Sequence, residues 1–407
     1  MSSSYDYDIL IVGAGIAGLR CALTLKRAHP KKKIAIAEKY NYVGGRIYTY
    51  SPKEFPGIHW ESGAGRIHGS HTKTLSLLKQ HNLTLFPLSP EAEFRFSDDP
   101  SHPIADPWPA ISKLVVQHLA SLDPKLLRTH TVRALLTQIH GNSQANALLA
   151  PFPYKAEVDV LRADVALQAF QHEMKSSADF FVVKEGLDVL IKAMTKEAEA
   201  KGIEFLFDHE LIKVSEHTAT FKHKVLTADK LIVTLHSRAL RTVFPFTQHP
   251  LVKKVIMCPL LRIYAIFDRP WFANLPKTIT DSPLRFVIPI NANAGTIMIS
   301  YTDASDTQVW SKKSDKQLQK AIVKEARRLF PEREIPEPLF FKSHLWNAGC
   351  SYWTVGDYDV TEASRSMLHP YPTKMPNVYA CGESFSLKQC WIEGALEHAD
   401  ELLKKYF

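Results

Sequence analysis

The sequence predicts an α/β fold with two domains: a discontinuous one built on a parallel β-sheet, and a second one of mixed α+β structure. Three observations lead to this prediction. The chain opens with a strand, a glycine-rich turn and a helix. It returns to strand and helix patterns after residue 180, and it closes with a strand, a turn and a helix. The length of 407 residues allows two or three domains, because a typical domain has roughly 100–200 residues.

Composition and charge are those of an ordinary globular protein. Apolar residues make up 45% of the chain and charged residues 23%, which is enough to bury a large core. The longest apolar runs, such as residues 9–19, are far shorter than the about 20 residues that cross a bilayer, so we expect no membrane span. The net charge of +8 comes from basic residues that are spread along the chain and not interleaved with aromatic ones. We therefore expect no nucleic-acid partner.

The start of the chain and the cysteines give two further expectations. Residues 1–6 lack the basic and apolar regions of a signal peptide, so we expect a cytoplasmic location. The five cysteines are odd in number and contain no CxxC pair. This pattern indicates neither a disulfide framework nor a metal site.

The first motif is a strand–glycine–helix unit at the N-terminus. Residues 7–12 (YDILIV) have the composition of a buried parallel strand, and a GxGxxG pattern follows at Gly13, Gly15 and Gly18. Gly13 permits the tight turn, Gly15 lets a pyrophosphate approach the backbone, and Gly18 lets the helix and strand pack closely. The helix N-terminus offers free N–H groups to the phosphates.

A carboxylate completes this unit. A second apolar strand at residues 34–37 ends at Glu38, which follows Gly18 by 20 residues. A carboxylate at this position can accept hydrogen bonds from both ribose hydroxyls, and it disfavours a 2′-phosphate. The whole unit predicts a Rossmann-type domain that binds FAD or NAD rather than NADP.

A second glycine pair decides between the two dinucleotides. Gly44, Gly45 and Arg46 come shortly after Glu38. At this position they can contact the far side of a pyrophosphate. Together with Glu38, the segment 43–49 (VGGRIYT) resembles the flavin-containing amine oxidase family. That family includes monoamine, polyamine and L-amino-acid oxidases, and the resemblance implies FAD as the cofactor.

The C-terminal end resembles the same family. Residues 377–383 form a strand that runs into a turn, and residues 390–399 open the last helix. By this resemblance, Gly382 and Glu383 lie along the pyrophosphate and ribityl chain. The backbone of Trp391 and Ile392 meets the pyrimidine edge of the flavin, and the Trp391 ring lines the substrate site.

The resemblance also assigns residues between the two ends. Gly63 and Ala64 are expected to pass the flavin ring, and the backbone near Val214 to meet the adenine. Tyr352 and Trp353 are expected to form an aromatic wall. Arg262 stands where many members of the family have a lysine that assists the reaction with oxygen.

The cysteine nearest the C-terminal segment bears on how the flavin is held. Cys350 follows a glycine, as does the cysteine that binds flavin covalently in monoamine oxidases. Its spacing from Gly382 places it out of register with that cysteine. We therefore expect a non-covalent FAD and an ordinary thiol at Cys350.

The same resemblance implies the domain order. We expect the FAD-binding domain to comprise residues 1–72, 180–240 and 340–407. The substrate-binding domain is expected to comprise residues 73–179 and 241–339. Helical patterns lie at residues 110–122 and 132–139, and strand patterns at 181–183, 203–207, 211–214, 230–234 and 258–272.

Arg66 points to the class of substrate. It lies where L-amino-acid oxidases carry an arginine that binds the substrate carboxylate, and the alternative is a salt bridge to the flavin or at the surface. A tryptophan at Trp391, rather than a tyrosine, also resembles the amino-acid branch. We expect oxidation of an L-amino acid to a keto acid, ammonia and hydrogen peroxide, with molecular oxygen as the acceptor.

Several alternatives stay open at this stage. One is a polyamine or monoamine oxidase. Another is a flavin-dependent desaturase or dehydrogenase that does not use oxygen, and a third is a flavoprotein that only binds. The sequence also leaves open whether the protein forms a homodimer.

Overall fold

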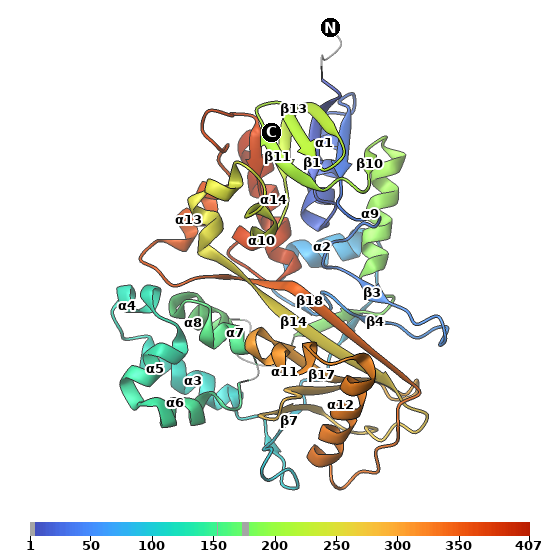
Figure 1. Ribbon diagram of the computed structural model, residues 1–407, viewed down its shortest axis with the longest axis vertical. Coiled ribbons are helices and arrows are strands. Elements are labelled where there is room, and N and C mark those ends of the chain that lie inside the picture. The colour runs from blue at the N-terminus through green and yellow to red at the C-terminus, as the bar shows by residue number, and fades with distance from the viewer. Residues whose placement is uncertain (1–4, 153, 173–178) are drawn as a thin grey trace.

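The computed structural model describes residues 5–152, 154–172 and 179–407. The predicted domain ranges also include residues 1–4, 153 and 173–178, which lie outside the described residues. Two large sheets organise the chain (Figure 1). The first sheet and its helices occupy the top of the view with both ends of the chain, and the second sheet lies below them.

The first sheet has seven strands in the described chain, and its centre is parallel. Strand β1 is buried between β2 and β13, and the apolar sequence of β1 and β2 reflects burial on both faces. The strands are β10 (Glu204–Leu206), β2 (Ile34–Ala37), β1 (Tyr7–Val12), β13 (Val225–Val233), β12 (Thr218–Phe221) and β11 (Leu211–Ser215), with β19 (Val378–Ala380) also beside β13. This sheet confirms the predicted Rossmann-type architecture.

Helices from three distant parts of the sequence share one core against this sheet. They are α1 (Ile16–Ala28), α9 (Asp188–Ala200) and α14 (Ile392–Tyr406), with α2 (Thr72–Gln80) packed on α14. Helix α1 begins directly after Gly15, which has an extended backbone and offers no side-chain cap, and ends before Pro30. The N-terminal N–H groups of α1 are therefore left for a ligand.

The second sheet also has seven strands among the described residues. Its long strands β14 and β18 cross the middle of the molecule (Figure 1). The order is β18 (Phe340–Trp353), β14 (Val255–Ile266), β17 (Thr296–Asp303), β16 (Phe286–Asn291), β15 (Lys277–Thr280), β7 (Ala92–Arg95) and β8 (Ile104–Ala105).

One predicted domain boundary needs correction. The boundary at residue 340 assigned β18 to the first domain. In the structure β18 pairs with β14 from Ile266↔Phe340 to Val255↔Trp353, so it is a strand of the second sheet. The backbone hydrogen bonds of such a long strand must be satisfied by a neighbouring strand, and β14 provides it.

The helical patterns predicted in the middle of the chain are confirmed as α3 and α5. A group of helices lies beside the second sheet: α3 (Trp108–Leu119), α4 (Pro124–Thr129), α5 (Val132–His140), α6 (Asn142–Leu149), α7 (Lys155–Asp159) and α8 (Ala163–His172). Helix α12 (Asp315–Leu329) begins at a capping box formed by Ser314 and Gln317, and it buries an apolar face under the sheet.

Short elements complete the chain. The short strands are β3 (Thr49–Tyr50), β4 (Trp60–Glu61), β5 (Ile67–His68), β6 (Leu85–Pro87) and β9 (Phe180–Val183). The short helices are α10 (Ser237–Leu240), α11 (Gln308–Ser311) and α13 (Val360–Met367), with 3-10 turns η1 (Phe246–Gln248), η2 (Pro250–Lys254), η3 (Ala304–Thr307) and η4 (Glu383–Phe385).

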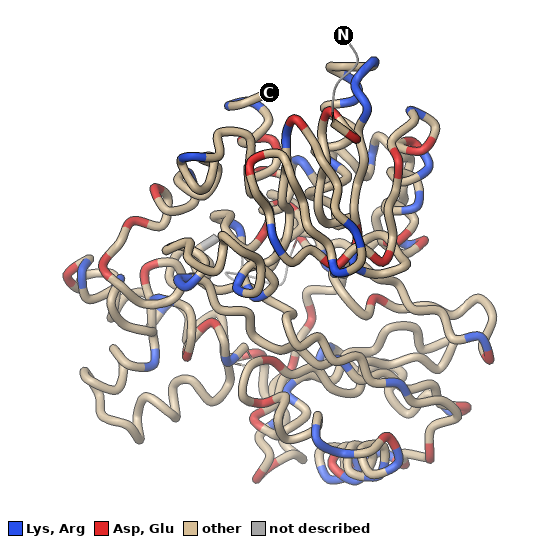
Figure 2. The backbone as a smooth tube through the Cα atoms, turned by 45° about the horizontal axis from the view of Figure 1, so that its top comes forward, with Lys and Arg blue, Asp and Glu red and all other residues tan. Residues whose placement is uncertain are grey.

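Charges are mixed over the whole backbone trace. Figure 2 shows Lys and Arg interspersed with Asp and Glu over both sheets and their helices. Within the described residues, no helix is long and apolar enough to cross a membrane.

Candidate active site

A single large cavity runs between the two sheets. Its volume is about 1930 Å³, whereas a pocket for one small ligand typically measures about 300–1,000 Å³. Both sheets line it: the glycine-rich turn after β1 lies at one end, and the inner face of the second sheet lies at the other. The cavity is therefore large enough for a dinucleotide and a second, smaller molecule.

The glycine-rich turn forms the wall at the first end. Gly13 has φ +107°, a conformation that favours glycine. A Cβ atom added to Gly15 would meet no heavy atom within 4 Å, and a Cβ atom added to Gly45 would lie 3.5 Å from the Cα of Gly15. Gly15 and Gly44 also pair as an isolated parallel bridge. These glycines leave a bare backbone surface that faces the cavity.

Gly18 has a different role from its neighbours. It does not line the cavity. A Cβ atom there would collide with the carbonyl oxygen of Gly13, so Gly18 allows helix α1 to pack closely on β1.

Glu38 lies at the carboxyl end of β2, as predicted, and lines the cavity. Its Oε2 accepts the N–H of Ala14 at 2.8 Å and its Oε1 accepts the N–H of Tyr40 at 3.0 Å. These bonds fix the carboxylate, and each oxygen keeps a second lone pair for a ligand hydroxyl.

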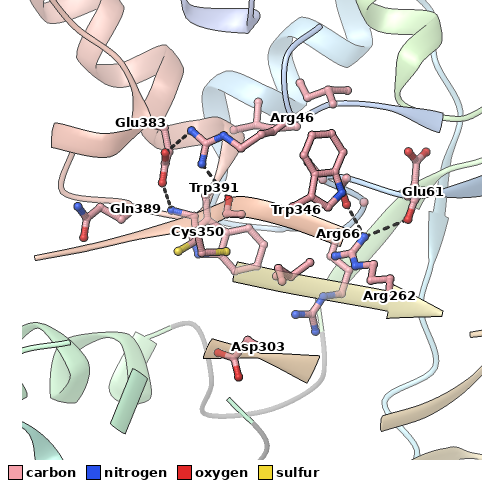
Figure 3. Close-up of a pocket in the computed structure, with 18 of the residues that line it drawn as sticks. Arg46, Glu61, Arg66, Arg262, Asp303, Trp346, Cys350, Glu383, Gln389 and Trp391 are labelled. Atoms are coloured by element: carbon pink, nitrogen blue, oxygen red, sulfur yellow. Dashed lines mark hydrogen bonds and ion pairs between the residues drawn. The ribbon is translucent and has the colours of Figure 1, made fainter. Parts of the chain in front are cut away.

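Arg46 joins the N-terminal and C-terminal parts of the site. Its Nη2 is 2.5 Å from Oε2 of Glu383, and its Nη1 donates to the carbonyl of Gly349 at 3.0 Å. Glu383 is buried, and its Oε1 also accepts the N–H of Cys390 at 2.5 Å. Figure 3 shows Arg46 and Glu383 facing each other across the cavity wall.

The turn before η4 is held by a buried histidine. Gly382 has φ +138° and donates its N–H to Nδ1 of His398 at 3.0 Å. The other ring nitrogen of His398 lies 3.1 Å from the carbonyl oxygen of Ser364. Burial lowers the pKa of His398 to about 4. The ring is therefore neutral at ordinary pH, with Nε2–H donating and Nδ1 accepting.

Helix α14 presents its N-terminus to the same cavity. Trp391 precedes the helix in an extended conformation, and both Trp391 and Ile392 line the cavity. The Trp391 ring contacts His71 at a centroid distance of 4.8 Å and Phe180 at 6.1 Å. The neighbouring Glu393 does not act in the cavity, because its carboxylate accepts the N–H groups at the start of α2 (residues 73 and 74).

The segment after β4 forms the central wall. Gly63 and Ala64 line the cavity, and their position beside the flavin ring stays a prediction. Nη1 of Arg262 donates to the carbonyl oxygens of Glu61, at 3.0 Å, and Gly63. Nε of Arg262 is buried without a hydrogen-bond partner among the described residues.

Arg66 lies at the far end of the cavity, near Arg262 and away from the Arg46–Glu383 pair (Figure 3). Its Nη2 donates to the hydroxyl of Tyr154 at 2.8 Å, and its guanidinium lies 5.3 Å from the centre of the Phe180 ring. Among the described residues, no carboxylate forms an ion pair with Arg66. The cation therefore faces a cavity lined by aromatic rings.

Besides Gly18, two predicted site residues lie outside the cavity. Trp353 is fully buried, where its ring packs against Phe385 and its Nε1 donates to the carbonyl of Ser386 at 3.1 Å. Neighbouring residues of a strand point to opposite faces, so Tyr352, not Trp353, lines the cavity. The predicted aromatic wall at Trp353 is thus wrong.

Val214 is the second correction. Its side chain is fully buried in the core, and its N–H donates to Phe244 at 2.8 Å. The residues of this segment that line the cavity are His209, Glu210 and Leu211. Val214 itself does not line the cavity, and the expectation that the backbone near it meets the adenine stays a prediction.

Cys350 is a residue of β18 and lines the cavity. The thiol of Cys390 lies close to it and donates to the carbonyl of Ser351 at 3.3 Å. Hydrogen bonding with Cys390 favours the thiolate and lowers the pKa of Cys350, although burial opposes this shift. All five cysteines are free.

Sequence reasoning missed several cavity residues. They are Tyr154, Lys277, Tyr301 and Trp346. Trp346 donates its Nε1–H to the carbonyl of Ser62 at 2.7 Å. The alternation of residues within β15 and β17 is the one sequence signal that could have indicated that Lys277 and Tyr301 point into the cavity. No local signal marks Tyr154.

The residues present fit a flavin dinucleotide. The open surface at Gly15 can accept a pyrophosphate, and Glu38 can accept ribose hydroxyls. The Arg46 cation suits the phosphate groups of the cofactor. The N-terminus of α14 suits a ring system that gains negative charge when it accepts electrons. Within the described residues, no group of three or more His, Cys, Asp or Glu side chains is placed to hold a metal ion.

Comparison with known proteins agrees with this geometry. The model of the family described as flavin containing amine oxidoreductase matches residues 16–401. YobN of Bacillus subtilis (strain 168), provisionally named an L-amino-acid oxidase, is 22% identical over 97% of this chain and 94% of its own. An L-amino-acid oxidase of Siganus canaliculatus is 21% identical over 96% of this chain and 83% of its own. A solved structure of putrescine oxidase bound to putrescine has a similar fold, with a TM-score of 0.76, 17% identity and 98% of both chains covered.

Proposed function

The chain belongs to the flavin-containing amine oxidoreductase family, and on this premise we propose that it oxidises an L-α-amino acid with a non-covalently bound FAD. The products are a keto acid, ammonia and hydrogen peroxide, with molecular oxygen as the electron acceptor. A flavin held by Glu38, Arg46 and Glu383 would supply an acceptor for the hydride equivalent that leaves the substrate α-carbon. The resulting imine is hydrolysed by water.

The observation that carries this proposal is the placement of Arg66. Its guanidinium lies in the cavity two residues beyond Ala64, which lines the same wall. A guanidinium can hold a carboxylate by two parallel hydrogen bonds. Tyr154, 2.8 Å away, limits the motion of Arg66 and offers its own hydroxyl. A carboxylate fixed at this point orients the substrate α-carbon toward the flavin-facing wall.

Aromatic residues of the cavity favour the neutral form of the substrate amine. Oxidation requires the neutral amine, and an apolar environment favours that form by disfavouring the ammonium ion. Trp391 and Phe180 supply aromatic surface in the cavity. His71, which packs against Trp391 outside the cavity lining, is neutral at ordinary pH because burial lowers its pKa to about 4. This wall is thus uncharged at ordinary pH and does not compete with Arg66 for the carboxylate.

The test is the variant Arg66→Ala, assayed on a panel of amino acids and their decarboxylated amines. Leaving a substrate carboxylate unpaired should cost about 3–5 kcal/mol, which is roughly a hundredfold to several-thousandfold loss in kcat/KM. Flavin content should be unchanged, and decarboxylated amines should be poor substrates for both enzymes. A wild-type preference for plain amines, or loss of flavin from the variant, would contradict the proposal.

Oxidation of a polyamine is the second candidate, because putrescine oxidase shares the fold. A diamine is a dication in water, and Arg66 and Arg262 both lie at the proposed substrate end. Like charges in a closed site repel strongly. Turnover of putrescine above that of any amino acid would favour this candidate instead.

A further inference from the structure

Lys277 is a further cation of the cavity, and the function proposed above gives it no role. It is the first residue of β15, and its side chain is half-buried. Residues two apart on a strand share a face: Lys277 and Ile279 both line the cavity, whereas Thr278 points away and donates its hydroxyl to Glu93 at 2.9 Å. The pleat of the strand therefore directs Lys277 into the cavity.

The sheet places Lys277 and Arg262 at opposite ends of an apolar surface. Their strands, β15 and β14, are separated by β16 and β17. Three steps between neighbouring strands span about 14 Å. Between them, the cavity is lined by Phe286, Ile288 and Met298. This span exceeds the length of a five-carbon diacid, so the cation that pairs with Lys277 for such a ligand is Arg66, whose charge acts on Lys277.

The acidic groups of the cavity do not neutralise Lys277. Among the described residues, no carboxylate lies within ion-pair distance of its Nζ. Asp106 is the acid that acts on it most strongly, but Oδ1 of Asp106 accepts the N–H of Trp108 at 3.0 Å. Asp303 accepts the N–H groups of residues 155 and 156 at 2.9 and 3.1 Å.

The electrostatic setting of Lys277 agrees with an anion site. Burial lowers the pKa of Lys277 to about 8, the nearby charge of Arg66 lowers it further, and Asp106 opposes the change. The ammonium form still predominates at pH 7. A half-buried ammonium beside another cation is stabilised when an anion binds to it.

We propose that Lys277 binds a second carboxylate on the substrate, so that the site takes an amino acid with an acidic side chain. This inference rests on the proposed function, in which Arg66 binds the α-carboxylate. The side chain then extends over the apolar surface toward Lys277. Lys277 is thus a residue that determines specificity, and it takes no part in the transfer of electrons.

The experiment measures binding without turnover, by isothermal titration calorimetry on the flavin-loaded protein. The ligands are glutarate and valerate, which share a five-carbon chain but carry two carboxylates and one. Wild-type protein should bind glutarate at least about tenfold more tightly, about 1.4 kcal/mol. Lys277→Met should abolish this difference and leave valerate binding unchanged. Lys320→Met, at an exposed position of α12, is the control for the loss of one positive charge.

A second variant keeps the test decisive if Lys277→Met folds poorly. Asp106→Asn removes the opposing acid and retains the acceptor for Trp108, so at pH 6, where Lys277 is protonated in both proteins, it should tighten glutarate binding. Equal affinity for both ligands in wild-type protein, or no effect of either variant on glutarate, would overturn the inference.

Failure of the role of Lys277 and failure of the proposed function give different results. If the enzyme oxidises neutral amino acids and binds valerate as tightly as glutarate, the role of Lys277 fails and the proposed function stands. If no amino acid is oxidised and Arg66→Ala does not weaken valerate binding, the proposed function fails as well.

Discussion

Arg46 and Glu383 form an ion pair of 2.5 Å between residues that are 337 positions apart in the sequence. The pair fastens the glycine-rich segment after β2 to the turn that precedes α14. Both segments line the cavity, so the contact holds together two walls of the proposed flavin site.

Replacement of Glu383 by Gln should therefore weaken flavin binding. The variant loses a charge-assisted hydrogen bond worth about 1.5–3 kcal/mol, which is roughly a 10- to 150-fold rise in the Kd for FAD. Fluorescence titration of the apoprotein with FAD measures this. Glu197→Gln breaks the more exposed pair with Arg27 and serves as the control, because surface pairs contribute about 0–1 kcal/mol. Equal affinities in the two variants would contradict the assigned role.

Two glycines of the same motif should respond differently to substitution. Gly15→Val places its side chain in open space, so the protein should fold with its normal Tm but fail to bind FAD. Gly18→Val drives a side chain into the Gly13 carbonyl, so it should lower the Tm itself. Circular dichroism and the flavin absorbance of purified protein separate the two effects. Full flavin content in Gly15→Val would show that no pyrophosphate lies there.

FAD should be released by acid precipitation, because we propose non-covalent binding. That proposal depends on the spacing between Cys350 and Gly382, while the structure places Cys350 on the cavity wall. The yellow colour should appear in the supernatant after trichloroacetic acid treatment. Colour in the pellet of wild-type protein, but not of Cys350→Ser, would identify Cys350 as the attachment site.

Arg262 should make the reaction with oxygen slow. At this position the family resemblance implies a lysine. The planar guanidinium of Arg262 is held by the carbonyls of Glu61 and Gly63, so its donors are fixed differently from those of an ammonium group. Stopped-flow traces should show reduction by substrate clearly outpacing reoxidation by oxygen. Arg262→Lys should speed reoxidation with little change in reduction. Reoxidation that already exceeds reduction in the wild type would refute this prediction.

Stability should fall on acidification, partly through His398. Its pKa is about 4 in the folded state, against 6.5 ordinarily, so between these values the unfolded chain binds the extra proton. Stability therefore rises with pH from about 4 to 6.5, by up to about 1.4 kcal/mol per pH unit for this group. Gln at position 398 can keep the bonds to Gly382 and Ser364 without titrating. Urea unfolding at pH 5 and 7 should show a smaller pH dependence for His398→Gln.

Other groups do not obscure that comparison. Burial raises the pKa of Glu61 and of Asp303 to about 7. Each of these two carboxyl groups makes the protein less stable as the pH rises from about 4 to 7, because the folded state retains a proton that the unfolded chain has lost above pH about 4–4.5. These contributions are common to both proteins. An unchanged difference between pH 5 and 7 in the variant would show that His398 does not titrate as assigned.

The sequence by itself determined the nucleotide-binding unit. Gly13, Gly15 and Gly18 act within one turn and one helix, and Glu38 lies at the end of the next strand. Local spacing is sufficient for such features, because the turn, the helix start and the neighbouring parallel strand follow one another along the chain. The C-terminal turn at Gly382 was predictable for the same reason.

Only the tertiary structure decided which side chains face the cavity. Trp353 and Tyr352 are neighbours in sequence, yet the pleat of β18 buries one in the core and turns the other to the cavity. Tyr154 meets Arg66 across 88 positions of the sequence, and Lys277 enters the cavity because β15 pairs with β16. Strand register and the packing of one sheet against another fix these relationships, and neither is encoded in local spacing.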